Sequence, residues 1–104
     1  MAMFECNVNS NLTPTIVKMT DGLYLQKNGK QCMLLFEGCH IAPTWDIYEY
    51  LIMNNARPFA TSRATVVDVT VLGMVVLTNE GKLVTANGQA YTATWGTLTF
   101  FTND

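Results

Sequence analysis

Two arginines and the aromatic residues just before them are the residue types in this chain best suited to binding a ligand. Arg57 and Arg63 are the only arginines, and both fall in the segment 55–63, which has the composition of a loop. Guanidinium groups bind phosphate and carboxylate in a bidentate manner, and aromatic rings stack on bases. Together with Trp45 and Tyr48, they predict a site for a nucleotide-like anion. The competing interpretation is a solvated loop beside aromatic side chains that pack into the core.

The same region also has the composition of a surface that docks on another protein. The segment from 40 to 59 concentrates Trp, Tyr and Arg, the residue types that dominate interface hot spots. The residues we single out for this role are His40, Trp45, Tyr50 and Phe59. Packing of the aromatic side chains into the core is again the competing explanation.

Residue types that commonly perform catalysis are sparse. His40 is the only histidine, and the chain contains no G-x-S-x-G, P-loop, H-E-x-x-H or G-x-G-x-x-G motif. Asp46 and Glu49 are three residues apart and would share one face of a helix. A general acid needs a pKa raised by burial or by a like charge, whereas two acids on a helix surface are normally solvated. We therefore expect that the protein is not an enzyme and binds no cofactor.

The three cysteines, Cys6, Cys32 and Cys39, do not form a recognisable pattern. Their odd number and wide spacing argue against a disulfide framework. With His40 they could supply four zinc ligands, but structural zinc sites use closely spaced pairs such as C-x2-C. We expect reduced, mostly buried thiols and no metal site.

Composition excludes several classes of protein. Hydrophobic residues make up 49% of the 104 residues and charged residues 13%, about half the usual share of about 25%. Six scattered cations cannot neutralise a run of phosphates, so we expect no nucleic-acid partner. No apolar run approaches the ~18 residues of a membrane-spanning helix, and the first residues do not resemble a signal peptide. We expect one β-rich domain over residues 1–104, no membrane partner and a cytoplasmic location in the producing cell.

The dominant periodicity is that of β-strands, with Thr and Val abundant and turn dipeptides at short intervals. The expected strands cover residues 4–9, 15–20, 23–27, 30–36, 65–78 with a bend or bulge at Gly73, 82–86, 89–95 and 97–102. Asn28-Gly29 and Asn87-Gly88 predict two-residue hairpin turns, and residues 79–81 predict a three-residue loop. The first turn would place Leu25 opposite Cys32. Consecutive hairpins indicate antiparallel pairing.

Residues 44–54 are predicted to form the one helix. Pro43 suits its first position, or Thr44 its N-cap, and Pro58 prevents its continuation. A strand is the competing prediction, because residues 45–48 are also compatible with β-structure. The fold class is therefore mainly β: a single antiparallel β-sandwich or open barrel of about seven to eight strands, with one short inserted helix at about 44–54.

Charge nearly disappears after residue 64. The only charged residues in that part of the chain are Asp68, Glu80, Lys82 and Asp104. Exposed strand edges normally carry Lys, Pro or bulges that block pairing with other chains. Because these strands lack such protection, they must be covered either within the sandwich or by copies of the same chain, and we expect a homo-oligomer. The alternative is that threonine hydroxyl groups alone keep a solvated face soluble.

No motif identifies a family. The general character of the chain is short, rich in Thr and Asn, poor in charge and dominated by β-structure, and it resembles that of small accessory or structural proteins encoded by phages. This resemblance is one of composition, so it assigns no residue a role. The expected function is a non-catalytic, homo-oligomeric assembly or binding protein, on this resemblance part of a virus or phage particle, with another virion or host protein as a further partner. The alternatives are a protein that sequesters an anionic, nucleotide-like small molecule, and an inhibitor that docks on a larger host protein.

Overall fold

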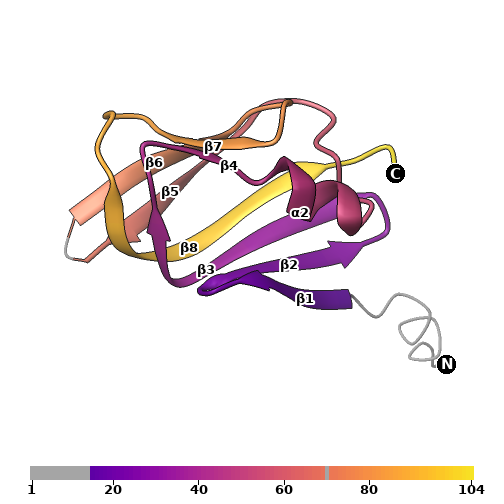
Figure 1. The fold of residues 1–104 in the computed structure, drawn as a ribbon, viewed down its shortest axis with the longest axis horizontal. Coiled ribbons are helices and arrows are strands. Elements are labelled where there is room, and N and C mark those ends of the chain that lie inside the picture. The colour runs from indigo at the N-terminus through magenta and orange to yellow at the C-terminus, as the bar shows by residue number, and fades with distance from the viewer. Residues whose placement is uncertain (1–14, 70) are drawn as a thin grey trace, which may run out of the picture.

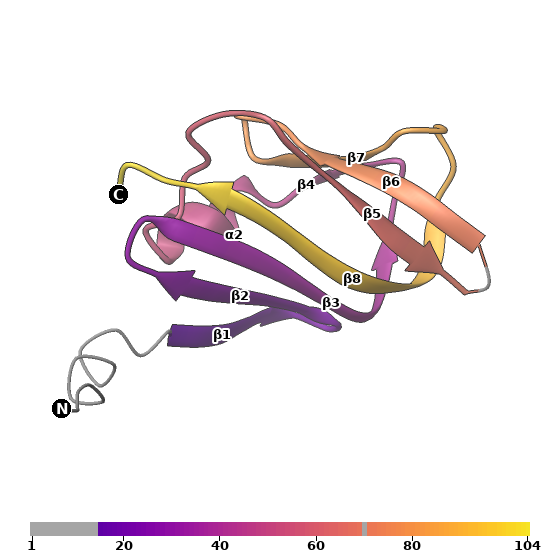
Figure 2. The same ribbon diagram turned by 180° about the vertical axis from the view of Figure 1, so that it is seen from behind.

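The computed structural model describes residues 15–69 and 71–104, which form one curled antiparallel sheet and a short helix. The elements in chain order are β1 (Thr15–Thr20), β2 (Leu23–Asn28), β3 (Gln31–Ile41), β4 (Thr44–Asp46), α2 (Tyr48–Met53), β5 (Ser62–Asp68), β6 (Val71–Leu77), β7 (Lys82–Thr85) and β8 (Tyr91–Phe101). Their order across the sheet is β1-β2-β3-β8-β5-β6-β7-β4. Figures 1 and 2 show the sheet from its two sides as an open half-barrel.

The predicted fold class is confirmed, because the strands formed by the described residues are antiparallel throughout, eight in number, and accompanied by one short helix. Of the two arrangements left open by the sequence, the strands form a single open, curled sheet rather than two stacked sheets. The strand expected at residues 4–9 lies outside the described residues.

The core lies on the inner, concave face of the sheet. Alternate side chains of a strand point to the same face, and those that point inward are apolar. The fully or almost fully buried side chains include Leu23, Leu25, Leu34, Phe36, Leu98 and Phe100. Helix α2 packs on this face through Leu51, which is also fully buried. Burial of each such side chain stabilises the fold by about 1.5–3 kcal/mol.

The β2–β3 hairpin exists as predicted, but its pairing is shifted by two residues. Leu25 lies opposite Leu34 rather than Cys32, and the two-residue turn is Gly29-Lys30. A type I′ turn at Asn28-Gly29 would need positive φ at both central residues. Positive φ occurs here at Gly29 (65°) and not at either neighbour. Because the shift is an even number of residues, the same side chains still point into the core.

Two predictions of strand boundaries were wrong. The continuous strand expected over residues 65–78 is a hairpin, in which β5 turns back into β6 with Asp68 opposite Val71. The two strands expected at 89–95 and 97–102 are one strand, β8. The hairpin turn predicted at Asn87-Gly88 was also wrong, because β8 inserts between β3 and β5 and these residues belong to a connection between strands that are not neighbours.

The helix predicted at 44–54 is shorter than expected, because its first residues form a strand. β4 pairs with β7, placing Asp46 opposite Lys82. The chain then turns, and the Asp46 Oδ1 atom accepts a hydrogen bond from the Tyr48 N–H at 3.0 Å. The predicted three-residue loop at 79–81 is confirmed. It contacts the junction between β4 and α2, since the Ile47 N–H donates to the Gly81 carbonyl at 2.9 Å.

Candidate functional site

The residues predicted to bind an anion do not all come together. Arg57 and Tyr48 line one shallow cleft of about 340 Å³, together with Asp46, Asn79 and Glu80. Trp45 packs against the core. Arg63 lies on the outer face of β5, opposite Val76. The cleft therefore offers one guanidinium group beside two carboxylates, and the carboxylates oppose the binding of an anion.

Arg57 is also engaged by a carboxylate of its own chain. Its Nη2 atom lies 3.4 Å from the Asp104 Oδ1 atom, and its backbone N–H donates to the Asp104 Oδ2 atom at 3.2 Å. That backbone hydrogen bond, aided by the charge of the guanidinium group, holds the pKa of Asp104 below its usual range. A second hollow of about 350 Å³ opens here, lined by Arg57, Pro58, Phe59, Asn103 and Asp104.

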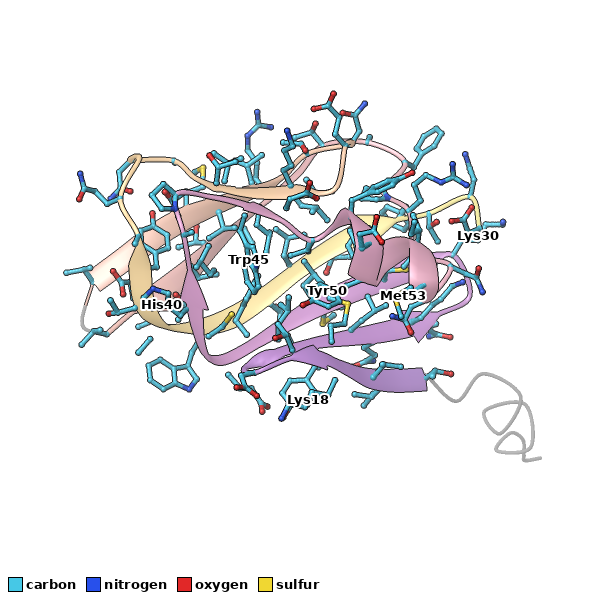
Figure 3. The ribbon with its side chains drawn as sticks, in the orientation of Figure 1. Lys18, Lys30, His40, Trp45, Tyr50 and Met53 are labelled. Atoms are coloured by element: carbon cyan, nitrogen blue, oxygen red, sulfur yellow. The ribbon has the colours of Figure 1, made fainter. Side chains whose placement is uncertain are left out.

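The residues predicted to dock on a protein are spread over the molecule. His40 is exposed near the end of β3, and Figure 3 shows it at the opposite end of the sheet from Met53 of α2. Trp45 and Tyr50 are half-buried and pack against the core, as the competing interpretation expected. Phe59 is exposed over 64% of its surface. These four residues do not form one surface.

The described cysteines are buried thiols. Burial raises the pKa of both Cys32 and Cys39, that of Cys39 to about 11, which leaves very little reactive thiolate at neutral pH. Within residues 15–69 and 71–104, no three His, Cys, Asp or Glu side chains gather as metal ligands would. Cys6 lies outside the described residues.

An exposed apolar row crosses three strands, β8, β5 and β6, on the outer, convex face, and Glu37 of β3 lies beside it. Val67 of β5 lies opposite both Trp95 of β8 and Leu72 of β6, and Trp95 lies opposite Glu37 of β3. Leu72 is 74% exposed, Trp95 49% and Val67 38%. At the end of the β5–β6 hairpin, Val69 and Val71 are also exposed, with Val71 on the opposite face of β6 from Leu72. We call the outer row together with this exposed hairpin end the hairpin surface: Val67, Val69, Val71, Leu72 and Trp95.

Sequence reasoning missed the hairpin surface because it treated residues 65–78 as one strand. In a continuous strand, Val67 and Leu72 would point to opposite faces. The fold-back places them side by side on the outer face. Isolated exposed apolar residues are ordinary, but a contiguous group is a sign of an interaction site.

The two edges of the open sheet are better protected than its face. β4, at one edge, has only three residues. β1, at the other edge, carries Lys18, whose Nζ atom lies 3.4 Å from the Asp21 carboxylate. Short strands and lysine both discourage edge-to-edge pairing. The hairpin surface, which has neither protection, is therefore the stronger candidate for contact with another chain.

Comparison with known proteins gives no further guide. No protein-family model, curated protein or solved structure matches this chain. Among the described residues, no helix has both the length and the apolar character needed to cross a membrane. A functional role must therefore be inferred from the residues and their geometry.

Proposed function

We propose that this chain is a non-catalytic assembly or binding protein that acts as a homo-oligomer. The observation that supports this function is the hairpin surface, where Trp95, Val67 and Leu72 form a continuous exposed row. Trp is the residue type most enriched at interface hot spots. Burial of each large side chain contributes about 1.5–3 kcal/mol, so a contact that covers the row gains free energy to offset the entropy lost on association.

The setting proposed for this assembly follows from composition. The chain resembles small structural or accessory proteins of phages in its low charge and its content of Thr and Asn. We propose a place in or beside a virus particle, where another virion or host protein could meet the same surface. Gene neighbours that encode capsid or tail proteins would support this setting, and neighbours without any link to a virus would contradict it.

Light scattering coupled to size-exclusion chromatography tests the assembly. The wild-type chain is expected to show a mass above that of one chain, which falls on dilution. A Trp95→Ser/Leu72→Ser variant is expected to elute as a monomer. Met53→Ser is the matched control, because Met53 is 76% exposed but lies on α2, away from the hairpin surface. A wild-type chain that stays monomeric at every concentration would end the proposal.

An inhibitor that docks on a larger host protein is the second candidate. It would use the same hairpin surface, because that surface is exposed and apolar whatever its partner. Wild-type protein that is monomeric, yet loses binding to a host protein on the Trp95→Ser substitution, would favour the inhibitor.

A further inference from the structure

We propose that the hairpin surface of one copy docks on the opposite end of the next copy, so that the chains assemble head to tail. The receiving site is a surface that we call the terminal surface, made of Phe59, Phe101, Lys30 and Arg57. This inference rests on the proposed homo-oligomeric function. It goes further by naming the two surfaces that contact each other in the oligomer.

The terminal surface is apolar at its centre and hollowed. Phe59 is 64% exposed and Phe101 58%. The two residues are joined through the backbone, because the Phe59 N–H donates to the Phe101 carbonyl at 2.8 Å. The hollow of about 350 Å³ is lined by Phe59, together with Arg57 and Asn103. Exposed rings next to a hollow can receive the apolar end of a hairpin.

Cations gather at the terminal end of the molecule. The Lys27 Nζ atom donates to the Asn55 carbonyl at 2.7 Å, and the Lys30 Nζ atom donates to the Asn103 carbonyl at 2.9 Å. These contacts are to neutral carbonyl groups, and neither lysine forms an ion pair among the described residues, but the charge of Asp104 acts on Lys27 as well as on Arg57. Arg57 adds a third cation, which Asp104 partly offsets.

Carboxylates gather at the hairpin end. Asp68 lies at the end of β5, where its Oδ1 atom accepts from the Thr92 N–H at 3.0 Å. Glu37 of β3 lies opposite Trp95, at the end of the apolar row. Neither carboxylate forms an ion pair among the described residues. The hairpin end is therefore negative where the terminal end is positive, and this complementarity is what identifies a second copy as the partner.

The two surfaces cannot meet within one chain. Trp95 and Phe101 lie on the same outer face of β8, six residues apart, which is about 20 Å in an extended strand. Figures 1 and 2 show the end of the β5–β6 hairpin and the C-terminal end of β8 at opposite ends of the molecule, whose longest extent is 51 Å. Contact between the surfaces must therefore join different copies.

A symmetric contact between two hairpin surfaces is less favourable. It would bring Glu37, which lies opposite Trp95 on the outer face, close to the same carboxylate of the other copy, and like charges across an interface repel. The head-to-tail contact places this carboxylate near Lys30 and Arg57 instead. A head-to-tail contact between copies produces a ring if it closes and a filament if it does not.

A mixing experiment distinguishes the two geometries. The hairpin variant is Val69→Asn/Leu72→Ser, and the terminal variant is Phe59→Ser/Phe101→Ser. All four residues are exposed, and asparagine tolerates the positive φ of residue 69, so both variants are expected to fold, which thermal unfolding verifies. Each variant keeps one intact surface. Each alone is expected to be monomeric, with association weakened about tenfold or more, and an equimolar mixture is expected to form a 1:1 dimer that grows no further.

The other outcomes separate this inference from the proposed function. If the wild-type chain is a monomer, both are overturned. If the wild-type chain assembles but the terminal variant assembles equally well, or the mixture forms no 1:1 dimer, the head-to-tail contact is overturned and the homo-oligomer stands.

Discussion

Val67 of β5 lies opposite Trp95 of β8, at the seam between two halves of the sheet. One half is β1-β2-β3-β8 and the other is β5-β6-β7-β4. Among the described residues, the strands at the seam are in register at this pair and at Asp68 with Thr94. The Val69 N–H donates to the Ala93 carbonyl at 3.2 Å, which adds one more hydrogen bond between the two halves of the sheet. A partner that covers Trp95 and Val67 would therefore bridge the two halves of the half-barrel.

Replacement of Val69 should stabilise the fold. Val69 has a φ of 57°, a conformation that costs an L-residue about 1–2 kcal/mol and is especially unfavourable for a β-branched side chain. Val69→Asn is expected to raise the free energy of unfolding by about 1 kcal/mol, or the melting temperature by about 4–8 °C. Urea unfolding at a concentration where the chain is monomeric measures this change. Val71→Asn, at an ordinary strand position of the same hairpin, should give no gain.

Gly81→Ala should be strongly destabilising. Gly81 has a φ of 82°, and a Cβ atom there would lie 2.8 Å from the Tyr48 Cα atom. The backbone at the start of α2 would have to move, so we expect a loss of about 2–4 kcal/mol from the left-handed conformation and the clash combined. Gly88→Ala is the control, because its φ is 73° but nothing lies within 4 Å of the added atom. Equal losses in the two variants would contradict the close contact at Gly81.

The thiols of Cys32 and Cys39 should resist alkylation in the folded protein. Burial raises the pKa of both, that of Cys39 to about 11 from an ordinary 9.0. Mass spectrometry after iodoacetamide treatment at neutral pH should find both cysteines unmodified unless urea is present. Because the folded state disfavours the thiolate, this contribution to stability is complete below pH 9.0 and is lost as the pH rises toward about 11. Labelling as fast as in urea would contradict the burial.

Because of Asp104, the free energy of unfolding should depend on pH in the acid range. The Arg57 backbone N–H lowers the pKa of Asp104 from its ordinary 3.8 in the folded state. The carboxylate therefore stabilises the fold above pH 3.8, and this effect is lost as the pH falls through the lowered pKa. Asp104→Asn should unfold in less urea than the wild type at neutral pH, with the difference shrinking in acid. A difference that stays constant with pH would rule out this role of the carboxylate.

Anionic nucleotides should not stabilise the protein. Asp46 and Glu80 share the cleft with Arg57, and Arg63 lies elsewhere on β5. A thermal-shift screen with a nucleoside triphosphate should therefore leave the melting temperature unchanged. A rise that disappears in Arg57→Ala but persists in Arg63→Ala would instead support the sequestering alternative.

The sequence by itself determined the class of fold and much of its local structure. Alternation of apolar and polar residues is a local signal, so the strand at 15–20, the 23–36 hairpin and the loop ending at Gly81 could all be predicted. The inner face of that hairpin was also predictable, because the even register shift left Leu25 and Leu34 pointing inward. Of the site residues, the exposure of Phe59 agrees with its predicted role, which stays a prediction.

Only the tertiary structure decided which strands are neighbours and which apolar residues remain outside. The insertion of β8 between β3 and β5 depends on pairing between residues far apart in the chain, and no local pattern specifies it. The turn at Val69 contains no glycine, asparagine or proline, the residues that usually indicate a turn. The sequence therefore predicted one continuous strand at the place where the chain folds back. That fold-back places Val67, Leu72 and Trp95 in one row. The hairpin surface is thus a product of long-range pairing.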